Sequence, residues 1–151
     1  MDHEPMRCVA EFRAAFDGRA DAERPELSEL RRALLTEEAA EAAEALTALA
    51  AALRAGADPA GAHRALAKEL ADVLYVTYGA ADALGIDLPA VFAEVHRSNM
   101  SKRDADGRVL RRADGKVLKG PGYRPPDLDG VVAWPPAPAG SDAHAGCGPM
   151  S

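Results

Sequence analysis

Apolar residues recur every three or four positions along four stretches of the first hundred residues, and this spacing predicts four amphipathic helices. Gly56 and Gly85 stand where the second and third of these patterns stop, as helix-ending glycines commonly do. Asp87 is a good N-cap for the fourth helix, with Pro89 in its first turn. The predicted helices cover residues 5–17, 26–54, 60–84 and the segment that follows Asp87.

The pattern changes after Ser98, where short β-prone pairs alternate with turn signals. "ADGRVL" (105–110) recurs as "ADGKVL" (113–118), which predicts a small hairpin that turns at Asp114–Gly115. Residues 119–128 read as irregular and extended, and the chain then becomes rich in Pro, Gly and Ala. We therefore expect one all-α domain over residues 1–128, with a hairpin-like extension, and a disordered tail over 129–151.

Hydrophobic residues are numerous in this chain, but many of their side chains are small. Of the 151 residues, 48% are hydrophobic but only 5% are aromatic, and much of the rest is alanine. Small side chains bury little surface each, so a single copy of the chain would have a thin core. We expect the helical bundle to be completed by oligomerisation, as a homodimer or a homotetramer.

Charge and cysteine content exclude several classes of protein. The net charge is −6 with no basic block, which argues against binding to nucleic acid. Cys8 and Cys147 form neither a CxxC motif nor a cluster with histidine, and we interpret His144 and Cys147 as tail residues rather than metal ligands. No signal peptide and no apolar run of transmembrane length is present, so we expect a cytoplasmic protein that does not bind membranes.

Acidic residues interrupt the apolar stripes of the second and third predicted helices. In the second helix, a stripe that begins with three leucines continues into two glutamates, and the third helix shows the same interruption with one glutamate and one aspartate. Residues three apart on a helix lie on neighbouring turns and can point at one site. The interrupting acids are Glu38, Glu41, Glu69 and Asp72.

Carboxylates that converge in a low-dielectric interior repel one another unless a cation joins them. Mg²⁺, or alternatively Mn²⁺, prefers such oxygen ligands and commonly bridges them to phosphates. A di-iron site is disfavoured because no Glu-x-x-His pair occurs on these helices. The alternative interpretation is that the glutamates form a solvated helix face, which is the interpretation we favour for Glu44.

Four sequence blocks together resemble the all-α nucleoside triphosphate pyrophosphohydrolases, a superfamily that includes MazG-like proteins, dimeric dUTPases and phosphoribosyl-ATP pyrophosphatases. Its hallmark is Glu-x-x-Glu on one helix and Glu-x-x-Asp on the next. The resemblance extends over roughly residues 5–128. The blocks are "EEAAE" (37–41), "KELADVLY" (68–75), "LGIDL" (84–88) and "SNMSK" (98–102).

The resemblance implies an α-helical bundle completed by an oligomer, and hydrolysis of a nucleoside triphosphate between its α and β phosphates. Glu38, Glu41, Glu69 and Asp72 would hold Mg²⁺, and Glu37 or Glu38 would orient or deprotonate the attacking water. A bound metal lowers the pKa of that water and neutralises charge on the phosphate oxygens. The superfamily's members differ in substrate. We expect a dUTP-like, dCTP-like or non-canonical nucleotide, with phosphoribosyl-ATP as the alternative.

Phosphate binding has to rely on metal and lysine, because no Walker-type loop is present. Asn99 and Lys102 match the superfamily's "NMSK"-like element and would contact the phosphates or the sugar. Lys119 and Tyr123 lie in the basic, glycine-rich "GKVLKGPGY" segment, which either closes over the ligand or forms a solvated hairpin. Two other classes stay open at this point: a non-catalytic helical adaptor, and a nucleotide sensor that binds without turnover.

Overall fold

The computed structural model describes residues 5–16, 25–103 and 106–133, which fall into two compact units, Met1–Ile86 and Asp87–Ser151. The helices are α1 (Pro5–Phe16), α2 (Pro25–Arg54), α3 (Ala60–Ala83) and α4 (Leu88–Met100). The all-α prediction is therefore confirmed. Residues 134–151, which make up most of the predicted tail, lie outside the described residues, and the division at residue 128 stays a prediction.

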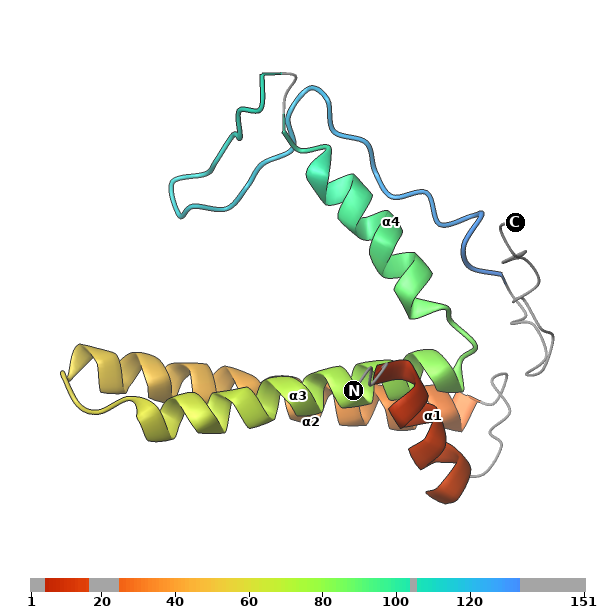
Figure 1. Cartoon of the computed structure of the whole chain (residues 1–151), viewed down its shortest axis with the longest axis horizontal. Coiled ribbons are helices and arrows are strands. Elements are labelled where there is room, and N and C mark those ends of the chain that lie inside the picture. The colour runs from red at the N-terminus through yellow and green to blue at the C-terminus, as the bar shows by residue number, and fades with distance from the viewer. Residues whose placement is uncertain (1–4, 17–24, 104–105, 134–151) are drawn as a thin grey trace, which may run out of the picture. The chain divides into compact units, whose positions relative to one another are not determined.

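Helices α2 and α3 form a long antiparallel hairpin (Figure 1). Gly56 and Gly85 follow α2 and α3, and each has a positive φ (64° and 65°) that side-chain-bearing residues adopt at a cost. At the end of α3, the N–H of Ile86 donates to the carbonyl of Ala81 (2.8 Å) across this glycine. Helix α2 thus ends at the predicted residue, Arg54, and α3 ends one residue before the predicted position.

Helix α1 packs against α3 through a glycine and a buried ion pair. A Cβ atom at Gly79 would lie 3.7 Å from the side chain of Val9, an ordinary van der Waals distance, so the two helices are in contact at this position. The guanidinium of Arg13, which is 7% exposed, forms an ion pair and hydrogen bond with Asp82. This contact fixes the position of α1 along α3 because a buried guanidinium without its carboxylate would be strongly unfavourable.

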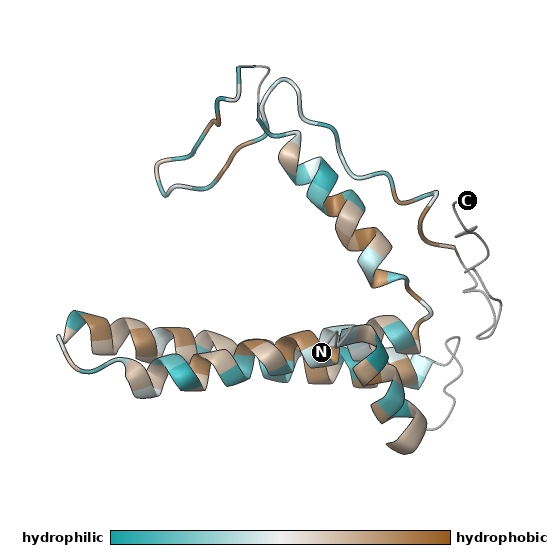
Figure 2. Ribbon diagram, in the orientation of Figure 1, coloured by the Kyte–Doolittle hydropathy of each residue, from teal (hydrophilic) through white to brown (hydrophobic). Residues whose placement is uncertain are grey.

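The core of the first unit is thin, as the alanine content predicts. Figure 2 shows apolar residues along both long helices. Several of their large side chains are exposed, and Leu30, which the helical pattern places on the buried stripe, is 52% exposed. Within the described residues, no helix combines the length and apolar content that crossing a bilayer requires. The buried hydrophobic side chains are Val9, Ala42, Leu66, Ala81 and Ala83.

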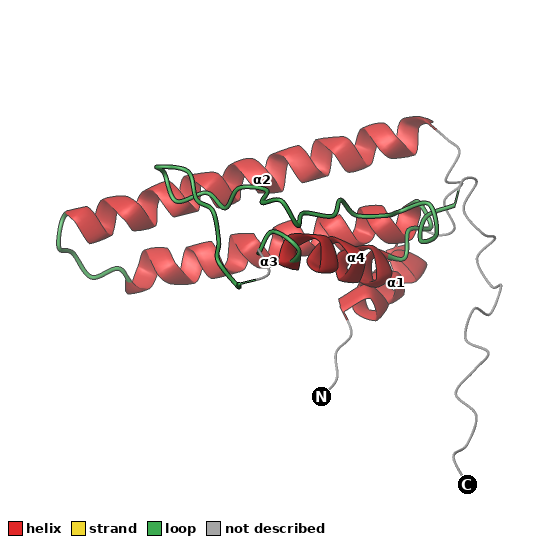
Figure 3. Ribbon diagram, turned by 90° about the horizontal axis from the view of Figure 1, so that it is seen from above, coloured by secondary structure: helices red, strands yellow, loops and turns green. Residues whose placement is uncertain are grey.

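The second unit consists of α4 and an irregular extension that follows it. Asp87 caps α4, because its carboxylate accepts a hydrogen bond from the N–H of Ala90 (3.1 Å). The predicted hairpin is present as an isolated antiparallel bridge between Arg111 and Val117, around a turn that contains Asp114. Figure 3 shows the extension as loop, with no strand among the residues described.

The end of the extension runs back along α4 and is held there by side-chain hydrogen bonds. The hydroxyl of Ser98, a buried residue, donates to the carbonyl of Arg124 (2.8 Å), and the N–H of Arg124 donates to the hydroxyl of Ser101 (2.8 Å). The N–H of Asp127 donates to the carboxylate of Glu94 (2.7 Å). We call these contacts the serine–glutamate clasp.

The clasp should loosen in acid through Glu94. Its carboxylate accepts hydrogen bonds from Arg97 and from the N–H of Asp127, which lower the pKa of Glu94 from 4.5 to about 2. A carboxyl pKa lowered by folding adds stability above its unfolded value, and this stability is lost as the pH falls from about 4.5 through about 2. We expect the amide proton signal of Asp127 to titrate near pH 2 in an NMR series. Glu94→Gln should abolish this titration, and its persistence in that variant would contradict the assignment.

Candidate metal centre

Three of the four predicted acids converge where α2 and α3 run side by side. Glu38 and Glu41 lie one turn apart on α2, Glu69 faces them from α3, and one carboxylate oxygen from each lies within 4.8 Å of the other two. Two ligands on opposite sides of a Mg²⁺ ion are about 4.2 Å apart, given Mg–O distances of about 2.1 Å. The oxygen-only donor set and its spacing therefore fit a single hard divalent cation after small side-chain rotations. We call these three residues the acid cluster.

The acid cluster is electrostatically unfavourable without a cation. The charges of Glu38 and then of Glu69 raise the pKa of Glu41 above its usual value. Glu38 and Glu69 are half-buried, whereas Glu41 is exposed, so the cluster lies at the edge of the helix pair and not in the enclosed interior that the apolar stripe predicts. An ion and a substrate can therefore approach the cluster from solvent.

Asp72, the fourth predicted ligand, is not part of the acid cluster. Its carboxylate lies 2.8 Å from the ammonium of Lys68, which also lies 3.1 Å from the carboxylate of Glu69. Hydrogen bonds to Asp72 and then to Glu69 raise the pKa of Lys68 above its usual value. Sequence reasoning missed Lys68, although Lys68 and Asp72 have the i,i+4 spacing that brings opposite charges together on a helix.

Lys68 should compete with a metal ion for the carboxylates of Glu69 and Asp72. Lys68→Met removes this competitor, and we expect a two- to fivefold lower Kd for Mg²⁺, because exposed ion pairs of this kind are weak. Arg64→Met is the matched control, since it removes the same charge from the preceding turn of α3. Isothermal titration with MgCl₂ measures the effect. Weaker Mg²⁺ binding by Lys68→Met would show that Lys68 supports the site.

The two remaining glutamates of this region lie outside the acid cluster. Glu37 and Glu44 are exposed and contribute no carboxylate to the group of three. The exposure of Glu44 agrees with the interpretation of this residue as part of a solvated helix face. Of the two candidates for activating water, Glu38 is the one whose carboxylate lies in the cluster, and the role of Glu37 stays a prediction.

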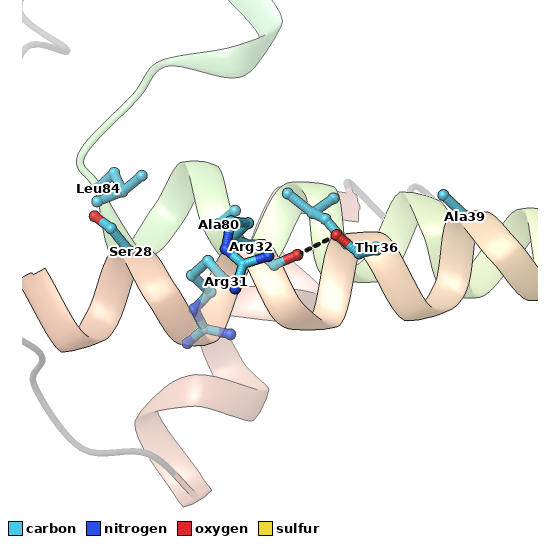
Figure 4. Close-up of a pocket in the computed structure, with 8 residues that line it drawn as sticks. Ser28, Arg31, Arg32, Thr36, Ala39, Ala80 and Leu84 are labelled. Carbon is cyan, nitrogen blue, oxygen red and sulfur yellow. Dashed lines mark hydrogen bonds between the residues drawn. The ribbon is translucent and has the colours of Figure 1, made fainter.

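An open groove of about 580 Å³ lies elsewhere on the same helix pair (Figure 4). Its lining is mainly apolar, and none of the predicted metal ligands contributes to it. Thr36 is held against the backbone of α2, where its hydroxyl donates to the carbonyl of Arg32 (2.8 Å). The α2 side of the groove includes Ser28, Arg31, Arg32 and Thr36, and the α3 side is formed by Ala80 and Leu84.

The four predicted substrate-binding residues come together within the second unit. The ammonium of Lys102 donates to the side-chain carbonyl of Asn99 (2.7 Å), and the ammonium of Lys119 lies 4.5 Å from the centre of the Tyr123 ring. A hydrogen bond with Ser98 and the charges of Lys119 and Lys102 lower the pKa of Tyr123. Lys102 and Lys119, which are 17 positions apart in the sequence, thus contribute to one cationic group.

A comparison with known families identifies the family to which the paired helices belong. The sequence profile of the phosphoribosyl-ATP pyrophosphohydrolase family matches residues 9–99, a span that contains all four predicted metal ligands. A comparison with curated proteins finds no match. The family match covers more than half of the 151 residues. The chain therefore belongs to the phosphoribosyl-ATP pyrophosphohydrolase family within the all-α MazG-like superfamily, and it is a hydrolase that acts on phosphoanhydride bonds.

Proposed function

We propose that the protein hydrolyses the α–β phosphoanhydride of phosphoribosyl-ATP in a Mg²⁺-dependent reaction that releases pyrophosphate. The family match supports this substrate better than the dUTP-like or dCTP-like nucleotide that the superfamily resemblance favours. The observation that carries the proposal is the convergence of three carboxylates from α2 and α3 within 4.8 Å. Such a group can bind a hard divalent cation, and the bound cation can in turn bind the phosphates of a triphosphate.

The proposed reaction adds water across one phosphoanhydride bond. The water oxygen bonds to phosphorus, the bridging P–O bond breaks, and the products are a nucleoside monophosphate and pyrophosphate. Bound Mg²⁺ would lower the pKa of the water and neutralise phosphate charge. Glu38, Glu41 and Glu69 would hold the ion, joined by Asp72 once its carboxylate leaves Lys68, and Glu38 would also receive the proton of the water. In the second unit, Asn99, Lys102, Lys119 and Tyr123 would contact the substrate.

A substrate panel tests the proposal directly. Purified protein is incubated with MgCl₂ and phosphoribosyl-ATP, ATP, dUTP, dCTP or modified nucleotides, and pyrophosphate is quantified. We expect the highest kcat/KM with phosphoribosyl-ATP. Faster hydrolysis of a deoxynucleotide would show that the proposed substrate is wrong and that the proposed type of reaction is right. Binding without any pyrophosphate release would identify a sensor, and neither binding nor hydrolysis would favour a helical adaptor.

We also propose that a second copy of the chain covers the exposed apolar surface of the helix pair. Leu70 and Leu74, one turn apart on α3, are 48% and 56% exposed, and Leu46 and Leu53 on α2 are 52% and 61% exposed. Removing such side chains from water is favourable by about 25 cal/mol per Å². We expect sedimentation to give a dimer or tetramer for the native chain and a smaller species for Leu74→Glu. A monomeric native chain would refute this arrangement.

A further inference from the structure

Three aromatic side chains meet where α1 packs against α3, and all three stay exposed. The ring centres of Phe12 and Phe16 are 4.6 Å apart, and the ring of Tyr75 meets that of Phe12 edge-on at 5.7 Å. The exposed fractions are 43% for Phe12, 75% for Phe16 and 40% for Tyr75. The whole chain has only three phenylalanines, three tyrosines and one tryptophan, so its aromatic residues are concentrated here. We call these three residues the aromatic patch.

The aromatic patch and the acid cluster share α3 and belong to the same unit. Tyr75 follows Asp72 by three residues, so their side chains lie on neighbouring turns of one side of the helix. Along the axis of α3, Tyr75 is about 9 Å from Glu69, at a rise of about 1.5 Å per residue. The sugar of a nucleotide separates its base from its first phosphate by a similar length, so one ligand can reach both places.

The rings are held in place by the contacts that join α1 to α3. The ion pair between Arg13 and Asp82 fixes the position of α1 along α3, and Val9 contacts the same helix at Gly79. These contacts hold Phe12, on the same helix as Arg13, against the ring of α3. The patch therefore has its shape before a ligand arrives, which reduces the entropy lost on binding.

Exposed rings of this kind favour a flat aromatic ligand. Every nucleobase has a π-face that can stack on aromatic side chains, whatever groups its edges carry. A purine has two fused rings and covers more apolar surface than a single-ring pyrimidine, so it gains more from burial. Contact with an aliphatic protein surface would not need rings, because leucines are already exposed on both long helices.

We propose that Phe12, Phe16 and Tyr75 stack against the purine base of the nucleotide whose phosphates reach the acid cluster. The inference rests on the proposed function and adds to it the residues that select the base. It also explains why three rings remain in water on a chain that is poor in aromatic residues. The site is formed by residues of the first unit alone.

NMR titration of the full chain with adenosine monophosphate tests the site, because this probe carries a purine but has no phosphoanhydride bond to hydrolyse. Ribose 5-phosphate is the matched probe without a base. With MgCl₂ present, we expect adenosine monophosphate to shift the ring proton signals of Phe12 and Tyr75 saturably, and to bind at least tenfold more tightly than ribose 5-phosphate. Tyr75→Leu should weaken its binding about tenfold, since the stacking ring is lost. Tyr75→Phe, which keeps the ring, should restore the affinity.

A second pair of variants keeps the test valid if Tyr75→Leu does not fold. Phe16→Leu removes the most exposed ring of the patch and should weaken binding about threefold. Phe92→Leu is the matched control, because it makes the same change at a phenylalanine that is 70% exposed and belongs to the second unit. It should bind adenosine monophosphate like the native chain. Circular dichroism checks the fold of each variant.

Equal affinity for adenosine monophosphate and ribose 5-phosphate, or no binding of either, would overturn the inference. Unchanged binding by Phe16→Leu together with a smaller species in sedimentation would assign the patch to a contact between copies of the chain. Failure of the proposed function gives a different result, namely purine binding at the patch without hydrolysis of any triphosphate. Hydrolysis whose KM is the same in Tyr75→Leu and the native chain would reject the aromatic patch alone.

Discussion

Glu41→Gln is expected to lower kcat/KM for pyrophosphate release about a thousandfold, the size of effect that loss of metal-assisted charge stabilisation produces. The amide keeps the shape of the side chain but removes the charge that the acid cluster needs to bind a cation. Pyrophosphate release under saturating MgCl₂ measures the loss. Glu44→Gln, three residues further along α2 and exposed, is the matched control and should stay within twofold of the native chain.

The same substitution should raise the melting temperature of the metal-free protein. Glu38 and Glu69 raise the pKa of Glu41, which means that folding is less favourable when Glu41 is ionised than when it is neutral. Above the unfolded pKa, a neutral side chain therefore removes a destabilising charge. A variant that is both inactive and less stable would assign Glu41 a structural role instead, and full activity in Glu41→Gln would reject the metal centre.

Removal of divalent metal is the second large effect, and we expect EDTA to abolish hydrolysis and MgCl₂ to restore it. At a Mg²⁺ concentration one hundred times its Kd, binding adds about 2.7 kcal/mol to the free energy of unfolding. For a chain of this length, that corresponds to a rise in melting temperature of roughly 5 to 10 °C. Differential scanning calorimetry with and without MgCl₂ measures the shift.

Control experiments distinguish a rise in melting temperature caused by specific Mg²⁺ binding from one caused by ionic strength alone. Glu69→Gln should lose the Mg²⁺-dependent rise, because it removes the carboxylate that α3 contributes to the acid cluster. Glu44→Gln should keep it, and KCl at matched ionic strength should not reproduce it. A native chain whose melting temperature responds to none of Mg²⁺, Mn²⁺ and Ca²⁺ would remove the basis of the metal proposal.

The helices could be predicted because local signals determine their ends. Gly56, Gly85 and Asp87 act on backbone groups a few residues away, so the sequence alone contains the information. Burial could not be predicted to the same extent. Leu30 has the spacing of a core residue, but its exposure depends on which surfaces the neighbouring helices cover, and this is a property of tertiary packing.

The candidate site also combines contacts that could be predicted from the sequence with contacts that could not. The i,i+3 spacing on α2 placed Glu38 and Glu41 together, and the interrupted stripe on α3 identified Glu69 as their partner. The serine–glutamate clasp could not be predicted, because Ser98 and Arg124 are 26 residues apart and their contact is made by an irregular segment without periodicity. Long-range contacts of this kind leave no pattern in a single sequence.

The ion pair between Lys68 and Asp72 has a consequence for how the protein acquires a metal ion. The chain holds a cation of its own beside the acid cluster, so part of the negative charge is already neutralised when α2 and α3 pair. At the proposed metal site, an incoming divalent ion would therefore replace the ammonium of Lys68 at the carboxylates of Glu69 and Asp72. If activity depends on Mg²⁺ as proposed, the helix pair would assemble without the metal, and the supply of divalent cation would set how many molecules become active.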